Sequence, residues 1–319
     1  MARFLVRRLV HGVPTVLLVS FLVFGAMHLA PGDPAALLMG QAAARPENAA
    51  ALERLRAEMG LDKPFLVQYV TWLSGVLRLD FGTSNRSGLP VLDLILGRLP
   101  ATLELVAAAF ILSLLLAVPA GVIAALRRGS MFDRLLMIFA VGGVAVPGFW
   151  LGMTLILLFA VQLQWLPSSG YVPFFEDPVR NLRHLILPAV TLAVYLLAVF
   201  SRFLRAEMIE TLRQDYIRTA LAKGLSMPVV AIRHGLRNTL TSLWTIMGME
   251  LGSLLGGVVI VEQVFGWSGI GWLAVQAVNN QDYPLVQAIV LMIAVGFTVI
   301  NIVVDIGYAL LNPRVRVDS

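Results

Sequence analysis

The stretch DYIRTALAKGLSMPVVAIRHGLRNTL, residues 215–240, is polar and basic within a chain that is otherwise very apolar. The 319 residues are 58% hydrophobic and only 13% charged, with a mean hydropathy of +0.83. A soluble domain is about half apolar and about a quarter charged. The composition therefore indicates a membrane protein, and the polar stretch must lie on one side of the membrane.

Segments long enough to cross a bilayer can be recognised by their length, because a span needs about 20 largely apolar residues. We expect six spans, at residues 10–30, 101–126, 135–163, 185–203, 243–264 and 285–309. The first is expected to be a retained anchor, since its end is a poor cleavage site for a signal peptidase. Pro119, Pro147 and Pro188 are expected to produce kinks, which membrane helices tolerate.

The distribution of lysine and arginine predicts the topology, because cytoplasmic loops carry an excess of both. With the N-terminus inside, most of the 24 basic residues fall in cytoplasmic segments or in one long outside loop, which carries little topological weight. Both termini and residues 215–240 are then cytoplasmic. The predicted organisation is a membrane helix at 1–30, an extracytoplasmic helical region at 31–99, a five-helix core at 100–311 with a cytoplasmic loop at 206–242, and a cytoplasmic tail at 312–319.

The outside region contains two expected helices. Residues 47–59 are rich in helix formers and end at Gly60, and residues 66–79 place leucine and valine at helical spacing. They form either a small cap on the membrane domain or a docking surface for an outside partner.

Several functions are disfavoured by the residues themselves. The chain has no Cys, its four histidines are widely separated, and no phosphate-binding P-loop is present, so we expect no metal and no bound ATP. Its net charge of +5 does not by itself indicate nucleic-acid binding, because lysine and arginine in a membrane protein first reflect the topology. The stretch Gly266-Trp267-Ser268-Gly269 resembles an intramembrane protease nucleophile, but no histidine follows His234 to act as a base. Trp267 and Trp272 instead predict an interfacial loop at the outer face.

The cytoplasmic loop has three interpretations: a solvated loop, a helix on the lipid surface, or a docking element for another protein. Its first part predicts a short helix that Gly224 ends, and a second helix at 229–240 leads into the fifth span. A lipid-surface helix usually has a broad apolar face. Here the apolar face is short and rich in alanine, so close approach of another protein is the preferred interpretation.

Polar and small residues inside the spans form a second group of candidates. Glu250 and Asp305 lie in the fifth and sixth spans, where charges are costly. These two acids and Asn301 are candidates for a pore or gate, or the acids pair structurally with Arg202, Asn301 or the backbone. Gly248, Gly252 and Gly256 recur every four residues, a pattern that lets helices pack closely within a chain or between subunits.

The sequence resembles the permease subunits of bacterial ABC importers of the dipeptide, oligopeptide and nickel branch. The resemblance rests on the pattern Asp-Tyr-x-Arg-Thr-Ala-x-Ala-Lys-Gly at 215–224 and His-x-Leu-Arg-Asn at 234–238. Further matching stretches lie at Arg7-Arg8-Leu9, 31–34, 61–64, 80–82, 128–130, 133–134, 261–265, 282–284 and 312–314. The wider Glu-Ala-Ala motif of the superfamily is only partly kept, with Arg218 and Thr219 in place of its first two residues.

The resemblance implies an all-α membrane protein with six transmembrane helices and the type I ABC importer permease fold. It further implies a bacterial cytoplasmic membrane, a second homologous permease, two cytoplasmic ATPases that bind ATP and Mg, and an extracytoplasmic binding protein that delivers a peptide, a nickel complex or glutathione. The residues implied in coupling to the ATPases are Asp215, Tyr216, Arg218, Thr219, Ala220, Ala222, Lys223 and Gly224, with His234, Arg237 and Asn238 in support. A stand-alone channel or secondary transporter is the alternative, although the broken third span has no clear counterpart in the second half.

Overall fold

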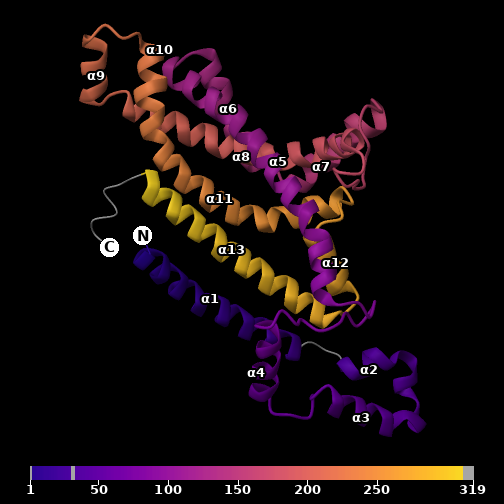
Figure 1. The fold of residues 1–319 in the computed structure, drawn as a ribbon. Coiled ribbons are helices and arrows are strands. Elements are labelled where there is room, and N and C mark those ends of the chain that lie inside the picture. The colour runs from indigo at the N-terminus through magenta and orange to yellow at the C-terminus, as the bar shows by residue number, and fades with distance from the viewer. Residues whose placement is uncertain (1, 30–32, 312–319) are drawn as a thin grey trace. The chain divides into compact units, whose positions relative to one another are not determined.

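The computed structural model describes residues 2–29 and 33–311, and these residues are mainly helical (Figure 1). Residues 31–32, part of one stretch that carries the family resemblance, and the predicted cytoplasmic tail at 312–319 lie outside the described residues. The α-helices are α1 (Ala2–Leu29), α2 (Pro34–Met39), α3 (Ala49–Glu58), α4 (Phe65–Val76), α5 (Val91–Leu126), α6 (Met131–Ala145), α7 (Gly148–Leu155), α8 (Pro178–Thr211), α9 (Asp215–Ala222), α10 (Met227–Val230), α11 (Arg237–Val264), α12 (Ile270–Asn279) and α13 (Tyr283–Leu311). Two π-helical segments, Ile156–Gln162 and Ala231–Leu236, continue α7 and precede α11.

The long helices account for the six predicted spans. Four helices in the described part are long and apolar enough to cross a membrane: Gly12–Leu29, Val91–Leu126, Pro178–Thr211 and Tyr283–Tyr308. Two bent pairs, Met131–Ala145 with Gly148–Gln162 and Met227–Leu254 with Gly256–Val264, bring the number to six if each pair is one span. The prediction of an all-helical, multi-span protein is therefore confirmed.

The third span is broken at Pro147, as predicted. Residue Val146 has ψ 122° and Pro147 ψ 131°, so both leave the helical conformation, and the direction of the chain changes by 104° between α6 and the following helix. The residue before a proline is pushed towards extended backbone, and proline itself cannot donate the next helical hydrogen bond. Pro119 and Pro188, by contrast, lie inside the uninterrupted helices α5 and α8.

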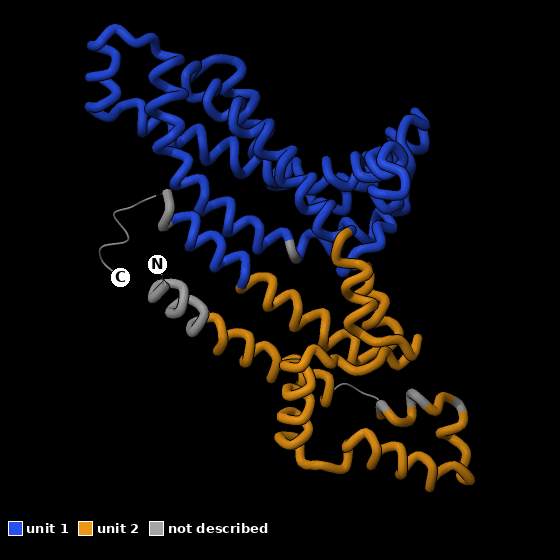
Figure 2. The backbone as a smooth tube through the Cα atoms, viewed as in Figure 1, with its two compact units in different colours: residues 1–5, 101–271, 299–319 blue, residues 6–100, 272–298 orange. Residues whose placement is uncertain are grey.

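The chain divides into two compact units, coloured separately in Figure 2. Unit 1 consists of residues 1–5, 101–271 and 299–319, and unit 2 of residues 6–100 and 272–298. The segment predicted as an extracytoplasmic helical region at 31–99 lies in unit 2, which also contains most of α1, all but the start of α12, and the first half of α13. Hydrophobic length marks spans along the sequence, but it does not reveal which spans pack together.

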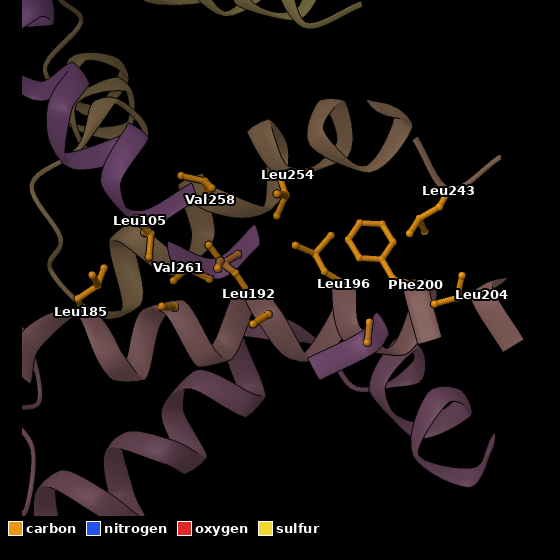
Figure 3. Packing of buried hydrophobic residues seen from close by; sticks show 14 of the residues in the cluster. Leu105, Leu185, Leu192, Leu196, Phe200, Leu204, Leu243, Leu254, Val258 and Val261 are labelled. Atoms are coloured by element: carbon orange, nitrogen blue, oxygen red, sulfur yellow. The ribbon is translucent and has the colours of Figure 1, made fainter. Parts of the chain in front are cut away.

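The core of unit 1 lies along α8, which packs against α6, α7 and α11. Leu196, Phe200 and Leu204 of α8 are fully buried, and Figure 3 shows them beside Leu243 and Leu254 of α11. Small residues permit the close approach of neighbouring helices. A Cβ added to Gly143 of α6, for example, would lie 2.8 Å from the Cβ of Ala198.

Unit 2 is organised by aromatic rings between α1 and α4. Phe24 lies 5.4 Å from Phe65 and 5.4 Å from Trp72 between ring centroids, and the Ser20 and Tyr69 hydroxyls lie 2.8 Å apart. The two predicted outside helices are confirmed as α3 and α4. Gly60 ends α3 as predicted, with a φ of +69° that glycine adopts without strain.

Candidate coupling and translocation site

The cytoplasmic loop contains the predicted short helix, α9, between α8 and α10. Figure 1 shows α9 at one end of the unit 1 helices, next to α10. The backbone reverses after α9 at Gly224, whose φ is +86°. Because glycine reaches this conformation without the clash of a Cβ, the turn explains its place in the motif. The second predicted helix is also present, as α10, a π-helical segment and α11 in continuous succession.

A small buried cluster holds α9 against the loop that follows it. Ile217 and Val230 are fully buried, and Ala220 is 8% exposed between them. Leu212 and Leu221 pack around this cluster. Ala220 therefore lies on the inner side of α9, and its predicted part in coupling to a partner stays a prediction. It lies three residues after Ile217, so both side chains face the same, inner side of the helix.

The opposite side of α9 is open. Six of the predicted coupling residues and the turn glycine are exposed: Asp215, Tyr216, Arg218, Thr219, Ala222, Lys223 and Gly224. Arg218 pairs with Asp215 at 3.4 Å, an exposed contact of small energetic weight. Partial burial of its ring raises the pKa of Tyr216.

Large apolar side chains extend this open surface beyond α9. Leu225, Met227, Val229 and Ile232 are between 37% and 61% exposed. Arg233 and Lys223 lie in the same loop and are also exposed. Exposed apolar side chains of this size are typical of surfaces that contact another protein or a membrane.

The three predicted supporting residues do not hold the loop by side-chain bonds. His234 is partly buried and Arg237 and Asn238 are exposed, and the described hydrogen bonds and ion pairs involve none of their side chains. Close packing at Gly235 joins the loop to α8 instead, since a Cβ there would lie 3.2 Å from Met208 Cε. Gly235 falls within the His-x-Leu-Arg-Asn pattern as its variable position, so the motif gave no signal for it.

An ion pair ties α6 to α8 near the cytoplasmic loop. Arg205 Nε contacts Asp133 Oδ1, and Arg205 Nη2 donates to Asp133 Oδ2 at 2.8 Å. Asp133, whose side chain is only 5% exposed, also accepts the Gly129 N–H at 2.9 Å. The paired donors of an arginine match a carboxylate in fixed geometry, so this contact fixes the two helices relative to each other.

Glu250 lies beside a cleft at the break in the third span. Its carboxyl group hydrogen-bonds the Tyr195 hydroxyl, and its Oε2 is buried without a hydrogen-bond partner. Tyr195 also lines a cavity of about 500 Å³ between Pro147 and the buried faces of α8 and α11. Figure 3 shows Leu192, Leu254 and Val261, which line the same cavity.

Asp305 and Asn301 lie on α13, where Asn301 is exposed and Asp305 half-buried. Next to Asp305, Trp244 Nε1 of α11 donates to the Val304 carbonyl at 2.8 Å. Val304 also covers Gly248, where a Cβ would lie 2.3 Å from Val304 Cγ2. The polar residues of the sixth span therefore sit beside a tight helix contact.

One glycine of the repeat on α11 lies in the contact between α11 and α13. Gly248 packs against α13, but a Cβ at Gly256 would meet nothing within 4 Å in the described residues. Gly256 is exposed and Gly252 half-buried. A packing face inside the chain is thus supported at Gly248, while at Gly252 and Gly256 the role in helix packing is still a prediction.

A buried network organises the Trp267 loop. Glu262 is fully buried and accepts a hydrogen bond from the Thr102 hydroxyl at 2.6 Å. The same hydroxyl oxygen accepts the Ile270 backbone N–H at 2.8 Å. Trp267 is also fully buried, and its indole N–H donates to the Ala101 carbonyl at 2.8 Å. The Trp267 ring thus fills the core and its one donor is satisfied inside, while the position of this loop at the outer membrane face stays a prediction.

Sequence comparisons agree with this architecture. Residues 117–317 match the family described as "Binding-protein-dependent transport system inner membrane component", and residues 1–106 match its N-terminal companion family. The "Putative peptide transport system permease protein" of Brucella abortus (strain 2308) is 43% identical over 318 residues, covering 100% of both chains. The glutathione transport system permease protein GsiC of Escherichia coli (strain K12) is 42% identical over 316 residues, covering 99% of both.

A comparison of structures identifies the same fold in a solved transporter. A chain of the inward-facing MetNI methionine ABC transporter aligns with a TM-score of 0.53 and 15% sequence identity. The alignment covers 69% of this chain and 97% of that one. At this identity the likeness shows the shared fold alone.

Proposed function

The chain belongs to the family of binding-protein-dependent transport system inner membrane components, and we propose that it is the permease subunit of an ATP-driven importer of peptides or glutathione-like solutes. The match to peptide and glutathione permeases over the whole length of the chain carries this proposal. The exposed surface of α9 and its neighbours supports it, since that surface is suited to a protein partner.

The partners follow from this role. A binding protein delivers the solute outside, a second homologous permease completes the pathway, and two ATPases bind ATP and Mg in the cytoplasm. The chain itself contains no P-loop sequence, so the nucleotide chemistry belongs to the ATPases. The bacterial cytoplasmic membrane is the compartment in which such an assembly works.

Coupling is assigned to the open side of α9. ATP binding favours one conformation of the ATPases, and it shifts the permease only if the contacts on α9 differ between the two states. The Arg205–Asp133 pair transmits this movement, because it joins α8, which leads into α9, to α6. The broken third span follows α6 and borders the cleft with Tyr195 and Glu250, which we assign to the solute pathway.

The decisive test compares two glycines. Gly224 and Gly129 both have positive φ, +86° and +81°, and a Cβ at either would meet nothing within 4 Å among the described residues. An arginine costs about 1–2 kcal/mol of backbone strain at either site, so the two variants have matched folding defects. Gly224→Arg is expected to insert normally, lose the ATPases on gentle purification, and abolish uptake, because the new side chain enters the docking surface.

Gly129→Arg is expected to keep the ATPases and most of the uptake. Mass spectrometry of the tagged complex identifies the retained subunits, and uptake of labelled glutathione and of dipeptides measures transport. Normal uptake by Gly224→Arg, or equal loss in both variants, would refute the assignment of α9. Purification of the wild-type chain without any ATPase would instead favour a stand-alone channel or secondary transporter.

A further inference from the structure

Unit 2 contains a second cavity, separate from the cleft beside Glu250. It measures about 470 Å³, within the range of roughly 300–1,000 Å³ typical of small-molecule sites. Its walls come from the end of α1, the turn after α3, α4, the segment before α5, and the start of α13. By the predicted topology it opens outside the membrane. Nothing in the coupling mechanism uses it.

The apolar side of the cavity is a fixed aromatic wall. Phe24 and His28 stack with centroids 6.1 Å apart, and Phe24 lies 5.4 Å from Trp72. All three line the cavity. Rings held by several neighbours form a preformed surface for an apolar side chain, so a ligand that binds there loses little free energy to reorganisation of the protein.

The opposite wall is fixed by hydrogen bonds. Asp282, which is 2% exposed, accepts the Ser84 hydroxyl at 2.5 Å and the Asn85 backbone N–H at 3.1 Å. These bonds join the segment before α5 to the turn that begins α13. They position the Asn85 side chain at the cavity, where its buried Nδ2 has no hydrogen-bond partner among the described residues. Buried donors are almost always satisfied, so this amide calls for an acceptor from a ligand.

The rim carries both signs of charge. Lys63 lies beside Gly60, and Glu58 and Asp80 line the same cavity. Among the described ion pairs, none joins Lys63 to either carboxylate. Asp33 and Glu53 of the same unit differ, since both are paired with Arg56. The charges at the cavity are therefore available to a ligand that has an ammonium and a carboxylate group.

We propose that this cavity binds a short zwitterionic peptide or peptide-like solute outside the membrane. Glu58 and Asp80 receive its ammonium group, Lys63 and the Asn85 amide receive its carboxylate, and the aromatic wall receives an apolar side chain. The ligand class rests on the proposed function. The site gives the permease its own affinity for solute after the binding protein releases it.

Equilibrium dialysis tests the site on the purified transporter complex without its binding protein. The probes are radiolabelled Ala-Phe, glutathione, and N-acetyl-Ala-Phe amide, which lacks both terminal charges. We expect at least one charged probe to bind saturably with a Kd below about 1 mM. The amide should bind at least about tenfold more weakly than that probe, since one charge-assisted contact is worth about a factor of ten.

Single substitutions separate this cavity from the membrane pathway. Glu58→Gln, Lys63→Met and Asn85→Ala are each expected to weaken binding about tenfold. Glu47→Gln, an exposed acid outside the cavity, is the matched control and should leave binding unchanged. Binding that none of the three cavity variants weakens would overturn the proposal, as would the absence of saturable binding up to about 5 mM.

The same preparation distinguishes failure of this site from failure of the proposed function. ATP-driven uptake of the probes with the binding protein present, but no saturable binding in its absence, would overturn the site and leave the importer role intact. Binding that the variants weaken, without any ATP-driven uptake, would support the site and refute the importer role. If only a segment of the docked binding protein occupies the cavity, and none of the probes does, the proposal is overturned.

Discussion

The position of α9 depends on one buried side chain. The helix has 8 residues, and isolated helices shorter than about 12 residues are marginal in water. Ile217 is its fully buried anchor, packed against Val230 and Ala220. Replacing Ile217 by alanine removes three buried carbon atoms. At about 0.8 kcal/mol for each, plus the cavity left behind, the cost is roughly 3 kcal/mol.

This loss falls on a local unit, so it should appear as local opening. A change of about 3 kcal/mol raises the equilibrium constant for detachment of α9 more than about a hundredfold. Hydrogen exchange followed by mass spectrometry, on the purified chain without ATPases, reports that change in a peptide covering residues 213–226. Exchange in α8 and α11 should be unaffected, because their cores do not include Ile217.

The loop provides a matched control, Ile232→Ala. Ile232 is 61% exposed, so the same chemical change removes little burial and should not accelerate exchange in α9. Equal exchange of residues 213–226 in Ile217→Ala and the wild type would refute the reasoning that this side chain anchors the helix. Acceleration by both variants to the same extent would show that α9 is held by contacts other than this cluster.

Two further substitutions test contacts that fix the membrane helices. Asp133→Asn leaves the half-buried Arg205 without its counterion and should lower stability by about 3 kcal/mol, seen as a lower Tm of the detergent-solubilised complex. Arg205→Lys should cost less, because the positive charge is retained. An unchanged Tm in Asp133→Asn would contradict this. Thr102→Val removes the partner of both Glu262 and the Ile270 N–H and should cost about 2–4 kcal/mol. Thr154→Val, at an exposed hydroxyl that bonds only its own helix, is the control, and equal Tm values for the two variants would argue against the network.

Features that depend on local sequence could be predicted without the structure. The spans follow from apolar length, α3 from its helix formers and Gly60, and α9 from the turn at Gly224. These signals act over one or two turns of helix, where propensity and backbone conformation dominate. The break at Pro147 was located correctly, but its 104° bend depends on how α7 packs afterwards and not on the proline alone.

Features that join distant segments could not be predicted. Asp133 and Arg205 are 72 residues apart, and no periodic pattern connects them. Tryptophan is a residue type common at membrane interfaces, but at Trp267 the Ala101 carbonyl accepts the indole N–H and so allows full burial. The burial of Ala220 could not be predicted for a related reason. Small residues suit both an open docking face and a crowded interior, and only the packing of Val230 distinguishes the two.

The two acids of α11 show how hydrogen-bond satisfaction separates architecture from function. Glu250 and Glu262 both lie in α11, where a carboxylate is costly in a membrane helix. Glu262 is held by Thr102, and Gly269 must lack a side chain because a Cβ would lie 2.0 Å from Glu262 Oε1. Glu250 instead keeps a buried oxygen without a partner, and its one bonded neighbour, Tyr195, faces the cleft. An unsatisfied group is retained where a transient ligand can satisfy it, so we assign Glu262 to the scaffold and Glu250 to the solute pathway.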